Sequence, residues 1–134
     1  MTGSISGERA TLVNTIKICI TGGPGAGKTT ALNLFRRELG ESVVVVPEVA
    51  TILFGGGFPR FSNSDACRHV QTSIFHVQQQ IEEAHRKTYP GRVLLCDRGT
   101  VDSAAYWPHG TDFFQNMNTT LEKELRSYDA CIFF

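Results

Sequence analysis

The residues with the clearest chemistry lie in one short segment that combines four glycines with a lysine and a threonine. The segment matches the pattern G-x-x-x-x-G-K-[ST] in full and reads Gly22-Gly23-Pro24-Gly25-Ala26-Gly27-Lys28-Thr29. Glycines let the backbone turn so that several N–H groups point into one concavity, where an anion can bind. We therefore predict that this loop holds the phosphates of a purine nucleoside triphosphate, either GTP or ATP.

The polar side chains of this phosphate loop have separate expected roles. Lys28 should reach the β- and γ-phosphates, and the Thr29 hydroxyl should ligate Mg²⁺. Thr30 offers a second hydroxyl near the α-phosphate. A helix that begins here adds the positive end of its dipole to the same spot. The prediction is thus a Mg²⁺-dependent nucleotide site.

Two carboxylates and an arginine are the candidates for the rest of the site. Asp97 ends the apolar run Val93–Cys96, which is the Walker-B form, and should orient Mg²⁺. Glu48 follows another apolar run and could accept a proton from an attacking hydroxyl or position a water; the alternative is a solvated turn residue. Arg98 could bind a phosphate or a substrate carboxylate, or form an ordinary surface ion pair.

Several further residues are weaker candidates. Asp102 and Tyr106 lie one helical turn apart and share a face. Phe75 and Gln78 could contact an acceptor ring, although glutamines on a helix surface usually have no specific role. The glycine-rich stretch from Phe54 to Phe61, which includes Arg60, could close over a ligand or be a plain connector. Trp107 is expected to pack in the core or against a lid.

Four apolar runs of strand length must position these groups. They are Ile16–Thr21, Ser42–Pro47, Arg92–Asp97 and Ala130–Phe134. Continuous apolar runs are typical of strands that are covered on both faces, and helical stretches separate them. The alternation predicts an α/β fold in which a parallel sheet has right-handed crossovers.

The predicted helices run from near Gly27 to Leu39, from Ser64 to Thr88, near Val101–Tyr106 and over Thr119–Ser127. Gly40 should end the first helix. On the longest helix, an apolar stripe recurs at spacings of three and four residues and is predicted to face the sheet. Its members are Cys67, Val70, Ile74, Val77, Ile81 and Ala84, which leaves Gln71, Gln78, Gln79, Glu82 and Glu83 for the other faces.

Size and composition are typical of one domain. The chain has 134 residues, and its 13 basic residues balance 13 acidic ones, so no nucleic-acid partner is expected. No segment is long and apolar enough to span a membrane, and residues 1–14 are expected to be a disordered lead-in to a domain over residues 15–134. No Cys or His spacing indicates zinc, and Cys19, Cys96 and Cys131 are expected to be core residues of a reduced, cytoplasmic protein.

Three segments together resemble a known group. These are T-G-G-P-G-A-G-K-T-T, V-V-P-E-V-A-T and L-L-C-D-R-G-T-V-D-S-A-A-Y. The combination is similar to the NadR-type ribosylnicotinamide kinase domain and to the TRPL translocation defect proteins, and more distantly to thymidylate and deoxynucleoside kinases. The resemblance covers about residues 16–134.

The resemblance implies a three-layer P-loop NTPase fold with a kinase-type sheet of strand order 2-3-1-4. It also implies that Glu48 is the catalytic base and that Asp97 and Arg98 lie near Mg²⁺ and the acceptor. Members of the group continue with a lid and a fifth strand beyond the point where this chain ends. We therefore expect a partial domain, with self-association through its last strand.

Three functions follow as alternatives. The first is a nucleotide-binding regulatory module with slow hydrolysis; the translocation-defect resemblance implies GTP binding, phosphoinositide recognition and a role in trafficking. The second is a small-molecule kinase in which Lys28, Glu48, Asp97 and Arg98 transfer the γ-phosphate to a nucleoside-like hydroxyl. The third is a non-catalytic isoform or fragment with weak binding.

Overall fold

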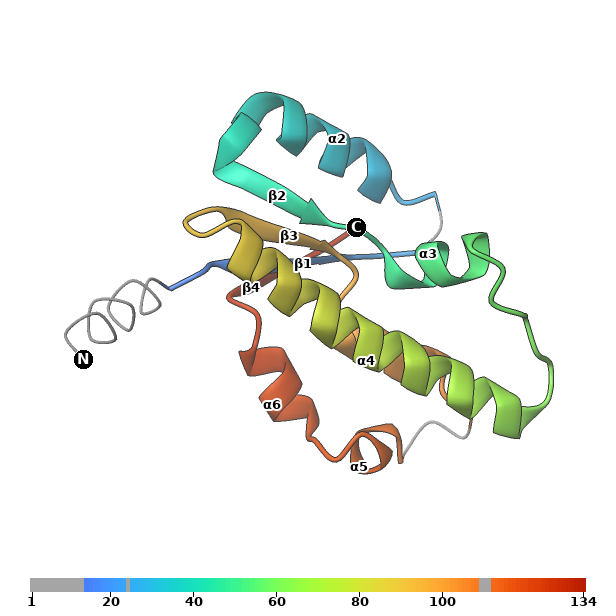
Figure 1. Ribbon diagram of the computed structural model, residues 1–134. Coiled ribbons are helices and arrows are strands. Elements are labelled where there is room, and N and C mark those ends of the chain that lie inside the picture. The colour runs from blue at the N-terminus through green and yellow to red at the C-terminus, as the bar shows by residue number, and fades with distance from the viewer. Residues whose placement is uncertain (1–13, 24, 109–111) are drawn as a thin grey trace.

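A parallel sheet of four strands forms the centre of the protein (Figure 1). The structure is a computed structural model that describes residues 14–23, 25–108 and 112–134. Its strands are β1 (Lys17–Thr21), β2 (Val43–Val46), β3 (Val93–Asp97) and β4 (Ala130–Phe133), in the spatial order β2-β3-β1-β4. This is the predicted order 2-3-1-4, and each strand agrees with its predicted run to within one residue at either end.

The two long helices also agree with the sequence. Helix α2 (Lys28–Leu39) ends at Gly40, whose φ of 52° lies in the left-handed region that glycine tolerates best. Helix α4 (Ser64–Thr88) begins after Asn63, whose side-chain oxygen accepts a hydrogen bond from the backbone N–H of Ala66 at 2.9 Å. Local capping chemistry therefore sets both of these boundaries.

The shorter elements differ more from expectation. Helices α3 (Val49–Gly55) and α5 (Phe113–Asn116) were not predicted, because α3 ends in glycines and α5 is a single turn. The stretch that was expected to be a loop from Phe54 thus begins inside α3. The predicted helix near Val101 is the 3₁₀ helix η2 (Thr100–Tyr106), and a second 3₁₀ turn, η1 (Gly40–Ser42), precedes β2. Helix α6 (Leu121–Arg126) is shorter than predicted.

The elements form three layers (Figure 1). Helix α2 covers one face of the sheet, where Ile20, Val45 and Leu95 pack against Leu32. Helix α4 covers the other face, where Ile81 packs against a second core cluster. That cluster consists of Val46, Leu94 and Cys96. Because both faces are covered, the central strands carry runs of apolar residues, Ile18–Ile20 in β1 and Val93–Cys96 in β3.

A third core cluster lies away from the sheet, between α4, η2 and α5. Trp107 and Phe113 pack edge-to-face with ring centroids 5.3 Å apart, and Phe75 packs on Phe113 at 5.6 Å. The expectation that Trp107 packs in the core is confirmed. The cluster also buries Phe75, which therefore is not available to stack on a ligand.

The buried face of α4 was predicted wrongly. Its buried residues are Val70, Phe75, Gln78 and Glu82, whereas Ala84 is exposed. The predicted stripe lies only partly on this face, because two polar side chains that the sequence assigned to solvent point inward. Their hydrogen-bond partners are on distant segments, which is the reason that periodicity alone failed here.

One expectation about a single cysteine also needs correction. Cys19 and Cys96 are buried as predicted, but Cys131 is exposed, because β4 is the outer strand of the described sheet and all four of its residues are exposed. The expectations for residues 1–13 and for Pro24 lie outside the described residues.

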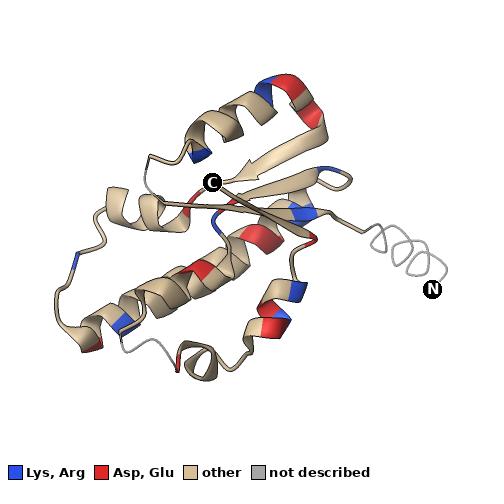
Figure 2. Cartoon of the chain, turned by 180° about the vertical axis from the view of Figure 1, so that it is seen from behind, with Lys and Arg blue, Asp and Glu red and all other residues tan. Residues whose placement is uncertain are grey.

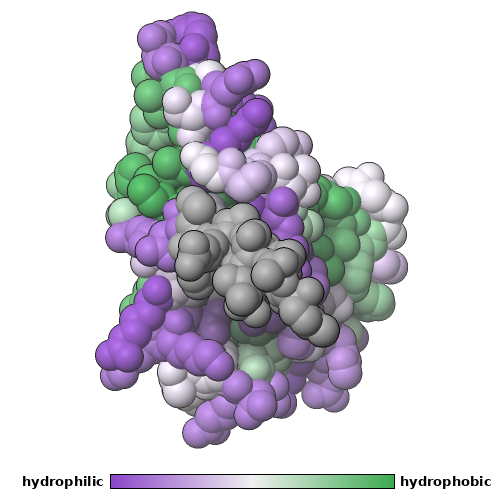
Figure 3. Space-filling view, turned by 60° about the vertical axis from the view of Figure 1, so that its left-hand side comes forward, coloured by the Kyte–Doolittle hydropathy of each residue, from purple (hydrophilic) through white to green (hydrophobic). Residues whose placement is uncertain are grey.

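On the face shown in Figure 3, hydrophobic residues gather in separate patches that hydrophilic residues surround. Among the described residues, no helix combines the length and apolar character that a membrane crossing requires.

Candidate functional site

The phosphate loop joins the carboxyl end of β1 to the first turn of α2. Gly25 and Gly27 adopt φ values of 74° and 94°, in the left-handed region where a side chain would be strained. Gly27 is the N-cap of α2, so Lys28 is the first helical residue and the helix N-terminus opens toward the loop. Sequence and local geometry thus agree on a place where an anion can bind. Pro24 is the one loop position outside the described residues.

Four predicted site residues meet beside this loop. The Lys28 ammonium donates hydrogen bonds to Asp97 Oδ1 and, at 3.0 Å, to Glu48 Oε2. Arg98 Nε donates to the same Glu48 oxygen at 3.0 Å, and its terminal nitrogen donates to the Gly22 carbonyl at 3.0 Å. Acidic and basic residues accordingly gather where β2 and β3 end (Figure 2). The positive charges of Lys28 and Arg98 there balance the negative charges of Glu48 and Asp97.

The contacts in this cluster shift the pKa values of its members. Partial burial alone would raise the pKa of Glu48, but hydrogen bonds from Thr51, Lys28 and Arg98 and the positive charge of Lys28 lower it below the ordinary value. Partial burial lowers the pKa of Lys28, yet its bonds to Asp97 and Glu48 outweigh this and leave the pKa raised. Glu48 and Lys28 are therefore both charged at neutral pH.

These features agree with the comparison to known families. A family model described as "AAA domain", of P-loop NTPase type, matches residues 17–134. The chain belongs to this AAA domain family. Among curated proteins, no match was found. Membership of the family supports nucleotide binding by this chain.

In this AAA domain, the turn after β3 has an unusual backbone. Arg98 has a φ of 71°, although it is not a glycine. Such a conformation costs about 1–2 kcal/mol and persists only where surrounding contacts hold it. The Arg98 N–H donates to the Ile20 carbonyl at 2.9 Å, and its own carbonyl accepts from Gln78 Nε2 at 3.2 Å. The strained backbone aims the guanidinium at Glu48 and Gly22.

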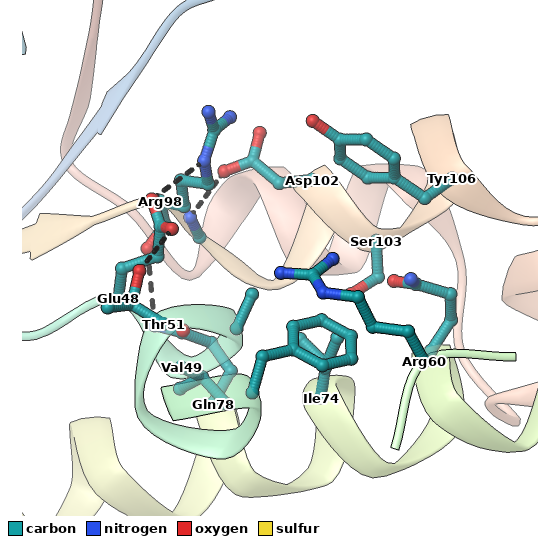
Figure 4. A pocket seen from close by; sticks show the side chains of 14 residues that line it. Glu48, Val49, Thr51, Arg60, Ile74, Gln78, Arg98, Asp102, Ser103 and Tyr106 are labelled. Carbon is teal, nitrogen blue, oxygen red and sulfur yellow. Dashed lines mark hydrogen bonds and ion pairs between the residues drawn. The ribbon is translucent and has the colours of Figure 1, made fainter. Parts of the chain in front are cut away.

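A cavity of about 330 Å³ opens next to this cluster (Figure 4). Glu48 and Arg98 lie at one end of the cavity, and Tyr106 lies toward the other end. Its apolar lining comes from α3 and α4. These residues are Val49, Ala50, Phe54 and Ile74. The cavity therefore combines an apolar wall with polar groups that converge at the end where the phosphate loop lies.

Four of the weaker sequence candidates line the cavity, namely Arg60, Gln78, Asp102 and Tyr106. Arg60 lines the cavity with its guanidinium 4.1 Å from the centre of the Phe54 ring, and Asp102 and Tyr106 line it from η2. Asp102 accepts hydrogen bonds from the Thr21 hydroxyl at 2.9 Å and from the Gly99 N–H at 2.7 Å, so it also braces the end of β1. Gln78 reaches the cavity wall, but its amide nitrogen is engaged within the protein.

Two polar lining residues were not singled out from the sequence. Thr51 donates from its hydroxyl to Glu48 Oε1 at 2.7 Å, and Ser103 lines the cavity from η2. Thr51 lies three residues after Glu48, in the first turn of a helix that was not predicted. Had α3 been recognised, this spacing would have indicated the contact.

Proposed function

We propose that the chain binds a Mg²⁺–purine nucleoside triphosphate at its phosphate loop and transfers the γ-phosphoryl group to a hydroxyl of a small acceptor in the cavity. One observation carries the proposal. The Glu48 carboxylate is hydrogen-bonded to Lys28 of the phosphate loop and also lines the cavity. One carboxylate thus faces both the triphosphate site and the space for an acceptor.

On the nucleotide side, the chain offers backbone N–H groups and one lysine. The positive-φ glycines and the N-terminus of α2 suit phosphate oxygens. A bound triphosphate would compete with Asp97 and Glu48 for the Lys28 ammonium, because all three are anionic. Lys28 would then exchange its carboxylate partners for phosphate, and Glu48 would lose one of its donors.

The residues present are suited to Mg²⁺. Mg²⁺ is commonly held by one or two protein oxygens, several waters and the phosphates of the substrate. Asp97 and the Thr29 hydroxyl offer such oxygens, and within the described ranges no group of three or more His, Cys, Asp or Glu residues forms a separate metal cage. When bound there, Mg²⁺ would neutralise charge on the transferring phosphoryl group.

On the acceptor side, Glu48 is the proposed general base. It would accept the proton of the acceptor hydroxyl while that oxygen bonds to the γ-phosphorus and the bond to the nucleoside diphosphate breaks. Its lowered pKa keeps it ionised, and release of Lys28 to the nucleotide would leave it free to accept the proton. Arg98 would hold Glu48 in place through the bond to Oε2.

The test combines a binding assay with product analysis. The chain is titrated with ATP and GTP in the presence of Mg²⁺, and mass spectrometry then follows a panel of nucleosides for phosphorylated products. We expect Lys28→Ala to abolish binding. We expect Glu48→Gln to keep binding within a few-fold but to lose about a hundredfold or more of transfer.

The matched control is Glu83→Gln, which changes an exposed carboxylate on α4 away from the loop. Free phosphate as the only product across the panel would reject phosphoryl transfer and leave a nucleotide hydrolase. Unchanged affinity in Lys28→Ala would reject the phosphate loop as the binding site.

A further inference from the structure

A buried carboxylate on α4 organises the turn that carries Arg98. The Glu82 side chain is only 4% exposed and accepts three hydrogen bonds. Lys17 donates to Oε1 at 2.8 Å, and both Gln78 Nε2 and the Tyr128 hydroxyl donate to Oε2 at 2.6 Å. Lys17 compensates its charge, so this polar group is fully engaged inside the protein.

Two of these partners, Gln78 and Tyr128, are also hydrogen-bonded to the turn after β3. Gln78 also donates to the Arg98 carbonyl at 3.2 Å, and the Tyr128 hydroxyl also accepts from the Thr100 N–H at 2.8 Å. The peptide groups on either side of Gly99 are therefore both held by residues that Glu82 orients. A carboxylate only accepts, which fixes the Gln78 amide with its nitrogen toward Glu82 and Arg98.

The fit around Gly99 is close. A Cβ atom at this position would lie 2.9 Å from Cys19 Sγ and 2.9 Å from the Tyr128 hydroxyl oxygen. The turn thus runs directly against the side chain that Glu82 holds. A shift of Tyr128 or Gln78 would change the path of the backbone from Arg98 to Thr100.

We propose that Glu82 is a positioning residue, which acts through Gln78 and Tyr128 to hold Arg98 in its left-handed conformation. In that conformation the guanidinium bridges Glu48 and the Gly22 carbonyl. Without the two bonds, the backbone would relax toward an ordinary φ, and the guanidinium would leave both partners. The inference rests on the proposed function only in assigning Arg98 to the site.

The test is spectroscopic and needs no nucleotide. The Nε–H resonance of Arg98 is assigned by NMR in the full chain, with Arg98→Lys as the reference that removes it. This proton is hydrogen-bonded to Glu48 Oε2, so its chemical shift and its exchange with water report directly whether the contact between Arg98 and Glu48 is in place. We expect Glu82→Gln and Gln78→Leu to shift the resonance and to speed its exchange with water about tenfold.

Glu83→Gln is the matched control, since it alters a neighbouring carboxylate on the exposed side of α4. Tyr128→Phe removes the hydroxyl that donates to Glu82 and accepts from the Thr100 N–H. It leaves the bond from Gln78 to the Arg98 carbonyl in place, so it should shift the resonance less than Gln78→Leu. If Glu82→Gln fails to fold, Gln78→Leu and Tyr128→Phe decide the question. An unshifted Arg98 resonance in folded Gln78→Leu would overturn the proposal, whatever the chain does with nucleotides.

Discussion

At the scale of single residues, the charged side chains of the site share hydrogen-bond partners. Glu48 accepts hydrogen bonds from Lys28, Arg98 and Thr51, and Lys28 also binds Asp97. A change in any one of these groups alters the environment of the others. The sequence indicated Lys28, Glu48, Asp97 and Arg98 separately, by their positions after a strand or within the loop, but it did not indicate Thr51. It did not indicate that Lys28 and Arg98 donate to the same carboxylate oxygen.

The lowered pKa of Glu48 makes a contribution to stability that depends on pH. The ordinary value for this carboxyl is 4.5, and its folded pKa is lower, so the unfolded chain binds the proton more readily. The stabilisation is complete above the ordinary pKa and is lost as pH falls through the lowered value. We expect wild type to exceed Glu48→Gln in free energy of unfolding at pH 7, with the difference shrinking below about pH 5.

Urea denaturation at a series of pH values measures this difference. Glu122→Gln, at an exposed position of α6, serves as the control and should show a smaller dependence on pH. A difference between wild type and Glu48→Gln that grows as the solution is acidified would contradict the assignment of these contacts.

At the scale of elements, the strands and long helices were predictable because their signals are local. Runs of apolar residues define β1 to β4, and Asn63 and Gly40 mark helix boundaries. The inward face of α4 was not predictable, since Gln78 and Glu82 are buried only through contacts with Lys17, Arg98 and Tyr128. The strand order came from the family resemblance rather than from the apolar pattern, and the structure confirms it.

The N-cap of α4 offers a direct test of local stabilisation. Removing the Asn63 side chain leaves the Ala66 N–H without its capping bond. We expect Asn63→Ala to lower the free energy of unfolding by about 1 kcal/mol. The control is Asn33→Ala, at an exposed position inside α2, which should change stability by less than about 0.5 kcal/mol. Equal effects of the two variants in urea denaturation would count against the cap.

The turn between β3 and η2 should tolerate no side chain at Gly99. An added methyl group would press on Cys19 and Tyr128, so we expect Gly99→Ala to destabilise the chain by about 1–3 kcal/mol. Gly55→Ala is the matched control, because a Cβ there meets nothing within 4 Å. Thermal denaturation measures both variants. A Gly99→Ala protein as stable as wild type would show that Tyr128 can move without loss.

At the scale of the whole molecule, the sheet has covered central strands but an exposed outer strand. Helices α2 and α4 cover the central strands, whereas β4 is exposed along its length and Phe133 is 80% exposed. An outer strand with exposed apolar side chains can pair with a second chain. Phe133 lies opposite Thr21, next to the phosphate loop, so such pairing would bring the second copy close to the proposed nucleotide site.

We expect this chain to associate reversibly through β4 as its concentration rises. Phe133→Lys should weaken the association about tenfold or more, because a charge on an outer strand disfavours pairing with another strand. Sedimentation velocity over a range of concentrations measures the effect. Phe61→Lys is the matched control, since Phe61 is an exposed aromatic residue in the segment between α3 and α4. If both variants sediment as wild type does, association does not use β4; if only Phe133→Lys becomes monomeric, the outer strand is the contact.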